Sequence, residues 1–509
     1  MLPIRFPSQS WFPSLSAGAP LLATLVVALA GCGASAGAGE AAWPPVGKKW
    51  FDRADASFRQ GDMEDARAAI DNALRVVPDR LEARLLSARV ALADLEYDRV
   101  LSTLRGLEGS EARSVRGRAY WYAGDLEHAA DELDKLLADP EVRDPWAAEI
   151  AKLARVGAGR KPFDLSGGLL AMVEMPRAGT SALIVPLELN GEPALGLVAT
   201  GTAEAVIDSS AGARPSWVSL RFGEKIEVRD VPALAKDLSG ISRQVNAPIK
   251  ILLGVNLLRH LHPTFDFTGG QFVVRSFDPP PPPVATTVKL NYVRGGGMLL
   301  RGAFGADQAA TPCSLLLDTS LTYPVALDTA GWKKAGVEAS SLRPVPGVSE
   351  LREGVLPMLR IGAFDIPRVP GVQGDAPVKE REDLLGIELD GLIGAGLLTT
   401  FRVTLVDGGR TMWLEDLPAE ALNQPSLLPS PAPEGAAASE DDAGAAEEPE
   451  RAPAKGAKPA PAGKGPAPGA KPAPASAPPT APAKAPAAQS TPGGAAPKAS
   501  PNAAPGAKP

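Results

Sequence analysis

Two short polar turns, each reached by a run of apolar residues, carry the residue types most able to do chemistry in this chain. The apolar run 315–317 leads into Asp318-Thr319-Ser320, and the apolar pair 197–198 leads into Ala199-Thr200-Gly201. A carboxylate held at such a place can position a water molecule and exchange a proton with it. Asp318 is therefore the candidate catalytic residue, with Thr319 and Ser320 beside it. Ala199, at the matching place of the other turn, offers neither a proton nor a charge.

The sequence around these two turns is repeated. Residues 251–254 read Ile-Leu-Leu-Gly and residues 391–394 read Gly-Leu-Ile-Gly, and each stretch is followed by a Leu-Leu pair and then by a threonine. A run of five prolines, 279–283, lies between the copies. Short β-type runs, such as 184–189 and 194–198 around an Asn-Gly turn, predict that each copy is mostly β. We therefore expect a duplicated β lobe, over 165–278 and 284–417.

Each copy resembles a lobe of the retropepsin-like (pepsin/retropepsin superfamily) aspartic proteases, in which an apolar strand delivers Asp-Thr/Ser-Gly. The resemblance implies that two lobes pair and that each contributes one aspartate. The two carboxylates then lie too close to ionise together, so one acts as a base and the other as an acid. Here Asp318 matches one aspartate, and Ala199, with Thr200 and Gly201, stands as the degenerate counterpart. The domain is accordingly expected to be non-catalytic.

Two alternatives would restore a pair of carboxylates. Asp318 of one molecule could meet Asp318 of a second molecule, although the covalently linked neighbouring lobe competes at high effective concentration. Asp208, nine positions after Ala199, could also reach inward. Its match to Asp328 favours a helix cap at both places instead. An active aspartic endopeptidase using Asp318 and an unidentified second acid is the alternative hypothesis.

Residues 46–160 have a helical pattern with short loops. Small and apolar residues recur at offsets that resemble tetratricopeptide repeats, and Gly61-Asp62 and Gly124-Asp125 mark the expected tight turns. The first match consists of Ala54, Gly61, Ala66, Ile70, Ala73 and Pro78. About three such repeats are the minimum for a stable stack. The resemblance implies that the helices bind a protein partner. We equally expect that they could act only as a spacer that orients the next domain.

The first residues are those of a targeting signal. The apolar stretch 21–30 is short for a membrane span and is followed by Gly31-Cys32. This string resembles the bacterial lipobox, which implies removal of 1–31, lipidation of Cys32 and a tether over 32–45. Gly33 after the cysteine implies delivery to the outer membrane. Cys313 is then the remaining thiol, and we expect it to be a small core residue.

Composition excludes several classes of function. The 52 basic and 59 acidic residues give a net charge of −7, which disfavours nucleic-acid binding. Three scattered histidines and two cysteines offer no metal site, and no phosphate loop or Gly-x-Ser-x-Gly motif occurs, so no cofactor is expected. Residues 418–509 form an Ala/Pro/Lys-rich tail that cannot bury a core and is expected to be disordered.

The predicted architecture is therefore multidomain: tetratricopeptide-like helices, a mostly-β two-lobed domain resembling an acid protease, and a disordered tail. The leading hypothesis is a lipid-anchored protein of the bacterial cell envelope that binds or scaffolds a protein or peptide partner. The partner would dock on the repeats or, by strand addition, between the lobes. A purely structural envelope component is a third hypothesis.

Overall fold

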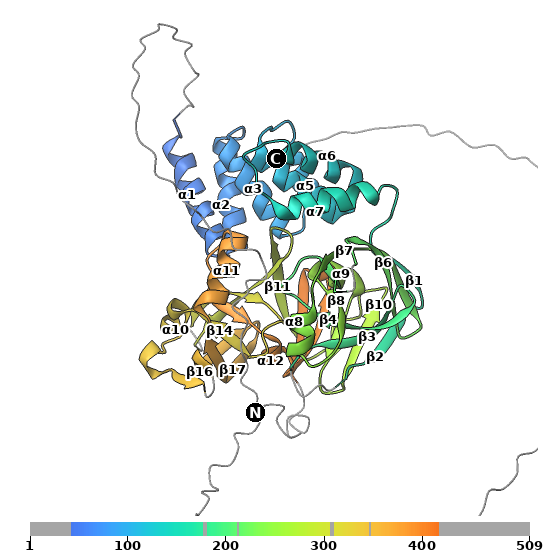
Figure 1. Cartoon of the computed structure of the whole chain (residues 1–509). Coiled ribbons are helices and arrows are strands. Elements are labelled where there is room, and N and C mark those ends of the chain that lie inside the picture. Colours follow the sequence, from blue (N-terminus) through green and yellow to red (C-terminus); the bar gives the residue numbers. More distant parts are fainter. Residues whose placement is uncertain (1–41, 177–180, 211–212, 306–309, 346–347, 417–509) are drawn as a thin grey trace, which may run out of the picture. The chain divides into compact units, whose positions relative to one another are not determined.

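The structure is a computed structural model, and it describes residues 42–176, 181–210, 213–305, 310–345 and 348–416 (Figure 1). The predicted signal sequence, Cys32, most of the predicted tether and the predicted tail from 418 onward lie outside these ranges. All the described residues belong to one compact unit. No helix in the described ranges is both long and apolar enough to cross a membrane.

A helical region comes first, as the sequence predicts. Its helices are α1 (Pro45–Arg59), α2 (Met63–Val76), α3 (Leu81–Ala93), α4 (Tyr97–Thr103), α5 (Ser110–Ala123), α6 (Leu126–Leu137) and α7 (Pro145–Val156). The two predicted tight turns are present: Gly61 has φ +71° and Gly124 has φ +82°, a region that glycine adopts without a steric penalty. The next residue then caps the following helix, since Asp62 accepts from Asp65 N and Asp125 from His128 N. The identity of the helices as tetratricopeptide repeats remains a prediction.

The first β lobe follows directly. It comprises β1 (Asp164–Gly167), β2 (Leu170–Glu174), β3 (Ile184–Leu189), β4 (Glu192–Val198), β5 (Ala205–Asp208), β6 (Ser216–Phe222), β7 (Ile226–Lys236), α8 (Ser239–Gln244), β8 (Ile249–Leu253), α9 (Val255–Leu261), β9 (Thr264–Asp266) and β10 (Gln271–Arg275). The predicted hairpin is confirmed as β3 and β4. Its turn residues Asn190 and Gly191 have φ +52° and +85°, as a tight two-residue hairpin turn requires.

The second lobe repeats this order with additions. It comprises β11 (Thr286–Val293), β12 (Gly297–Phe304), β13 (Thr311–Leu317), β14 (Val325–Leu327), α10 (Thr329–Lys334), β15 (Arg343–Val345), β16 (Val348–Ile361), β17 (Phe364–Gln373), α11 (Asp375–Leu385), β18 (Gly391–Ile393), α12 (Ala395–Leu398), β19 (Phe401–Val406) and β20 (Thr411–Asp416). Helix α11 is the longest helix described in this lobe. Cys313, on β13, is fully buried, as expected of a small core residue.

The two lobes share one sheet. Strands β2, β9 and β10 of the first lobe continue the sheet that holds the second lobe, and β9 pairs with β19 in antiparallel register. At this junction the hydroxyls of Thr264 and Thr404 lie 2.8 Å apart and are buried. These are the threonines that the duplication aligns. The lobes therefore pair with each other within one chain.

The helices are joined to the β lobes by both apolar and polar contacts. Phe58, Ile70 and Val90 belong to the same buried cluster as Leu299 and Leu316 of the second lobe. The polar contacts around the α1–α2 turn and around Glu204 are described below. Burial of shared apolar surface makes the helical region and the lobes dependent on each other for stability.

Candidate functional site

The two predicted turns occupy equivalent positions in their lobes. In the first lobe β4 pairs in parallel with β8, and Ala199 N donates to the carbonyl of Leu253 at 3.1 Å. In the second lobe β13 pairs in parallel with β18, and Asp318 N donates to the carbonyl of Ile393 at 2.8 Å. Because strand pairing and the terminal hydrogen bond both repeat, Ala199 and Asp318 are structural counterparts.

The turns are bound to each other through their threonines. Thr200 N donates to Thr319 Oγ1 and Thr319 N donates to Thr200 Oγ1, both at 3.0 Å. The hydroxyls in turn donate to the opposite strands: Thr200 Oγ1 to the carbonyl of Leu317 at 3.0 Å, and Thr319 Oγ1 to the carbonyl of Val198 at 2.8 Å. All four donors are buried, so this reciprocal set fixes the two turns against each other.

Ala199 faces an apolar environment. It is 6% exposed and belongs to a buried cluster with Leu197, Val206 and Ile241, the last from helix α8. Its neighbour Gly201 instead lies against Asp318, since a Cβ added to Gly201 would lie 2.4 Å from Asp318 Oδ1. The close approach of the turns therefore requires glycine here.

Both carboxylate oxygens of Asp318 are engaged, and the side chain is 3% exposed. Oδ1 accepts from Ser320 Oγ at 2.5 Å and from Ser320 N at 3.1 Å. Oδ2 accepts from Arg381 Nη2 at 2.7 Å and from Arg381 Nε at 3.1 Å. Arg381 comes from helix α11, and its side chain is 17% exposed. The only counter-charge that contacts Asp318 in the described chain is thus an arginine.

This ion pair determines the charge state of the site. Burial by itself would raise the pKa of Asp318, but the charge of Arg381 and the hydrogen bonds from Ser320 and Arg381 outweigh burial and lower the pKa. The same pairing raises the pKa of Arg381. Asp318 is consequently ionised at neutral and mildly acidic pH, and it cannot donate a proton there.

Arg381 is the site residue that sequence reasoning missed. It lies in the charged run Lys379-Glu380-Arg381-Glu382-Asp383, a composition typical of a solvated helix. Apolar residues on either side of the run, Val378 and Leu385, are buried, and they hold α11 against the lobe. The spacing of these two anchors is the signal that would have indicated a partly buried helix.

The alternative second acid, Asp208, lies elsewhere. Its carboxylate accepts from Ser210 N at 3.1 Å, Leu238 N at 3.3 Å and Lys250 Nζ at 3.1 Å. The prediction that it caps a helix is wrong, because no described helix starts there and the carboxylate closes a turn instead. Asp328 does cap a helix, accepting from Gly331 N at 2.7 Å.

The helical region contacts the loop that leaves the first turn. Glu204 is 3% exposed, and Trp121 Nε1, Trp146 Nε1 and Tyr122 Oη each lie 3.3 Å from its Oε1. Asn256 Nδ2 lies 3.5 Å from the other oxygen. Burial raises the pKa of Glu204 and the four hydrogen bonds partly offset this. Helices α5 and α7 therefore hold the first lobe through one buried carboxyl group.

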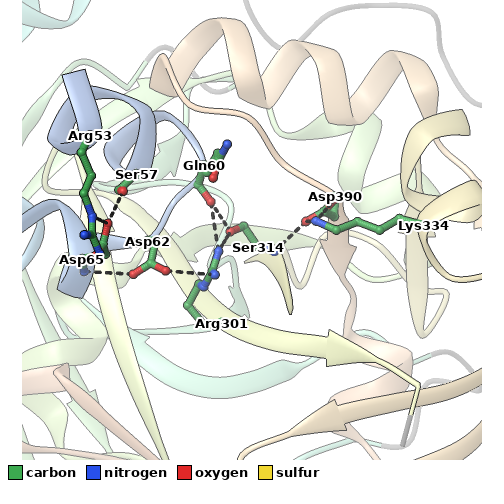
Figure 2. Close-up of polar contacts among 9 residues, drawn as sticks. All are labelled: Arg53, Ser57, Gln60, Asp62, Asp65, Arg301, Ser314, Lys334 and Asp390. Carbon is green, nitrogen blue, oxygen red and sulfur yellow. Dashed lines mark hydrogen bonds and ion pairs between the residues drawn. The ribbon is translucent and has the colours of Figure 1, made fainter. Parts of the chain in front are cut away.

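A second polar contact joins the α1–α2 turn to the second lobe (Figure 2). Ser314 Oγ donates to the carbonyl of Gln60 at 2.5 Å, and Arg301 donates to the same carbonyl at 3.2 Å and to Asp62 at 3.1 Å. On the far side, Asp390 accepts from Ser314 N at 2.8 Å. The helical turn is thus bound to β13, the strand that ends directly before Asp318.

Comparison with known proteins finds likenesses only among solved structures; no family model and no curated protein matches the sequence. A retropepsin-like aspartic protease from Rickettsia conorii has a TM-score of 0.19 and 18% identity, over 26% of this chain and 89% of its own. An aspartic proteinase from Irpex lacteus has a TM-score of 0.35 and 10% identity, over 48% and 97%. The structural neighbours are therefore aspartic proteases. Because both TM-scores are low, the equivalence of Ala199 and Asp318 rests on the hydrogen bonds of this chain.

Proposed function

We propose that this chain is a lipid-anchored envelope protein whose two-lobed, aspartic-protease-like domain binds or scaffolds a protein or peptide partner without cleaving it. The proposed loss of catalysis is supported by one observation. The carboxylate of Asp318 forms a buried ion pair with Arg381, and the residue at the equivalent position of the other lobe is Ala199, which has only a methyl group.

The chemistry of amide hydrolysis by two carboxylates explains why this arrangement is inactive. One carboxylate must remove a proton from water while the other, still protonated, donates to the scissile carbonyl. Asp318 is held ionised by Arg381, so it cannot be the acid. Its two oxygens already accept four hydrogen bonds, so little acceptor capacity remains for a water molecule. Ala199 can act neither as the base nor as the acid.

The helical region supports a scaffolding role. Contacts through Gln60, Asp62, Trp121 and Trp146 attach the helices to the chain's own lobes. These contacts support a role for the helices in fixing the orientation of the lobes. A partner would then bind the assembled body, and lipidation of Cys32 would hold that body at the membrane.

The test is cleavage and retention of peptides by the whole chain, because the lobes without their helices would expose Glu204 and the apolar residues around it. A mixed peptide pool is incubated with the protein from acid to neutral pH, and both products and bound peptides are identified by mass spectrometry. We expect intact peptides, some retained by the protein. Cleavage that disappears in Asp318→Asn would establish an aspartic endopeptidase and overturn the proposal.

An Ala199→Asp, Arg381→Gln double variant provides a matched comparison. It restores the second carboxylate and removes the competing cation. If the wild type is a degenerate form of this catalytic arrangement, cleavage should occur in the double variant at acid pH and not in either single variant. Retention of no peptide by any form would leave the purely structural role as the better description.

A further inference from the structure

A small buried cavity lies where helix α5 meets the first lobe. Its volume is about 10 Å³, and Trp121 and Tyr122 of the helix form part of its wall. Three polar residues of the first lobe also line it: Glu204, Asn256 and Arg259. A space of this size is close to the minimum that holds one water molecule, so a larger ligand does not fit.

Arg259, on helix α9, is 6% exposed, and one of its donors lacks an acceptor. Nη1 donates to Tyr97 Oη at 2.6 Å, and Nη2 donates to Asn256 Oδ1 at 2.7 Å. Nε is buried, and no acceptor in the described ranges forms a hydrogen bond with it. Because Nε and Nη2 donate from the same edge of a guanidinium, as they do in Arg381, Nε faces the side on which Asn256 lies. A buried donor without an acceptor is costly, so a partner is expected there.

Glu204 provides an acceptor at the same cavity. Its Oε1 accepts three hydrogen bonds from the helices, whereas the described contact of Oε2 is with Asn256 Nδ2 at 3.5 Å. That distance is at the limit for a hydrogen bond, so Oε2 keeps most of its acceptor capacity. Asn256 therefore contacts both side chains, and the unpartnered donor of Arg259 and the under-used oxygen of Glu204 lie around one residue of the cavity wall.

We propose that this cavity is a binding site for one water molecule, which accepts a hydrogen bond from Arg259 Nε and donates one to Glu204 Oε2. Water matches the site because it can accept and donate at the same time. A metal ion does not match, since the described contacts of the Glu204 carboxyl group are all with hydrogen-bond donors. An anion is larger than water and would lie against a carboxyl oxygen. The site is separate from Asp318, and it does not depend on the proposed function.

The bound water would extend the contact between the helices and the first lobe. Glu204 receives the helices, and Arg259 reaches Tyr97 of α4 and lies 5.4 Å from the ring of Tyr292 in the second lobe. A water molecule between Glu204 and Arg259 therefore connects the carboxyl group that the helices contact to a cation that lies against both lobes.

The first test is a crystal structure of the whole chain at a resolution that shows ordered water, with a second crystal soaked in bromide. We expect one peak within hydrogen-bond distance of both Arg259 Nε and Glu204 Oε2, and no anomalous bromide signal in the cavity. A bromide signal there, or a cavity without density, would overturn the proposal.

The second test counts slowly exchanging water molecules in solution by oxygen-17 relaxation dispersion. Arg259→Lys keeps the positive charge but has a carbon in place of Nε, so it should hold one such molecule fewer than the wild type. Arg116→Lys is the matched control, because Arg116 is also buried, at 9% exposed, but its Nε donates directly to Glu132 at 3.1 Å. Its count should equal that of the wild type. An equal count in the wild type and Arg259→Lys would overturn the proposal, and if Arg259→Lys does not fold, the crystal structure of the wild type decides.

Discussion

Replacing Asp318 with asparagine should destabilise this protein, which is the opposite of what removal of a strained catalytic charge commonly does. The substitution leaves the guanidinium of Arg381, 17% exposed, without its counter-charge. Breaking a buried ion pair by removing one partner costs about 3–5 kcal/mol. Asparagine retains one acceptor and Arg381 retains some contact with solvent, so we expect a loss of about 3 kcal/mol in the free energy of unfolding.

Removing both charges distinguishes the cost of an unpaired Arg381 from other effects of replacing Asp318. The double variant Asp318→Asn, Arg381→Met should recover most of the loss and lie within about 1 kcal/mol of the wild type, because a buried pair contributes little net stability over apolar packing. Arg381→Met alone should also cost about 3 kcal/mol, because it leaves the buried carboxylate of Asp318 without its counter-charge, so the coupling free energy in the double-mutant cycle is about 5 kcal/mol. The control is Asp365→Asn, which breaks the more exposed pair with Arg360 and should cost less than about 1 kcal/mol.

The measurement is urea unfolding of the whole chain at several pH values. The pKa of Asp318 is lowered by folding from its usual 3.8, so its ion pair contributes fully above pH 3.8 and is lost as the pH falls below that value. The difference between wild type and Asp318→Asn should therefore be constant from pH 5 to 7 and should shrink below pH 3.8. A neutral or stabilising Asp318→Asn at pH 7, or a cycle with no coupling, would show that Asp318 is not held by Arg381.

Four further outcomes are expected. Thr319→Val removes two buried hydrogen bonds between the turns and should lower the free energy of unfolding by about 2–3 kcal/mol, measured by urea unfolding; an unchanged value would mean that the turns do not depend on these bonds. Gly295→Leu places a side chain against Tyr122 at φ +79°, and limited proteolysis should then release the helical region faster than in the wild type; equal rates would contradict the described contact. Burial lowers the pKa of His260 to about 3, so the native state excludes a proton that the unfolded chain binds, and stability should fall by up to about 1.4 kcal/mol per pH unit below pH 6.5. His260→Phe should flatten that decline in the range between pH 6.5 and pH 4.5, and an unchanged slope would contradict the assignment. Cys32→Ala should abolish incorporation of labelled palmitate and release the protein from the membrane fraction; labelling that persists would exclude Cys32 as the lipidated residue.

The sequence predicts local features of this fold well, because their causes are local. The turn at Asn190-Gly191 follows from the need for two positive φ angles, and the cap at Asp328 from a carboxylate placed before a helical run. The duplication places Thr200 and Thr319 at equivalent positions, but only the structure shows that they bind each other. Asp208, matched to Asp328 by sequence, makes a different turn because Lys250 and Leu238 provide its partners.

The charge partner of Asp318 could not be predicted in the same way. Arg381 is 63 residues away along the chain, on a helix whose sequence resembles a solvated one. Which of its charges points inward depends on how Val378 and Leu385 pack, and that packing involves helices α1–α3 as well as the second lobe. The contact of Glu204 with two tryptophans likewise depends on the docking of the helices against the lobe, which no local pattern encodes.

The sheet shared by the lobes also determines the order in which parts of this chain can fold during synthesis. Thr264 and Thr404, which meet at the β9–β19 junction, are 140 residues apart, so the shared sheet cannot close until almost the whole β region has been synthesised. The helices emerge first, and about 250 residues separate the end of α7 from β19, which corresponds to roughly 12–50 s of translation at 5–20 residues per second. Until the first lobe and the β11–β12 hairpin have formed, Trp121 and Tyr122, which are 5% and 8% exposed in the folded chain, lack the residues that cover them. Nascent chains of this protein should therefore be clients of chaperones that shield apolar surface, and slow β closure, with its high contact order, should limit the yield of folded protein.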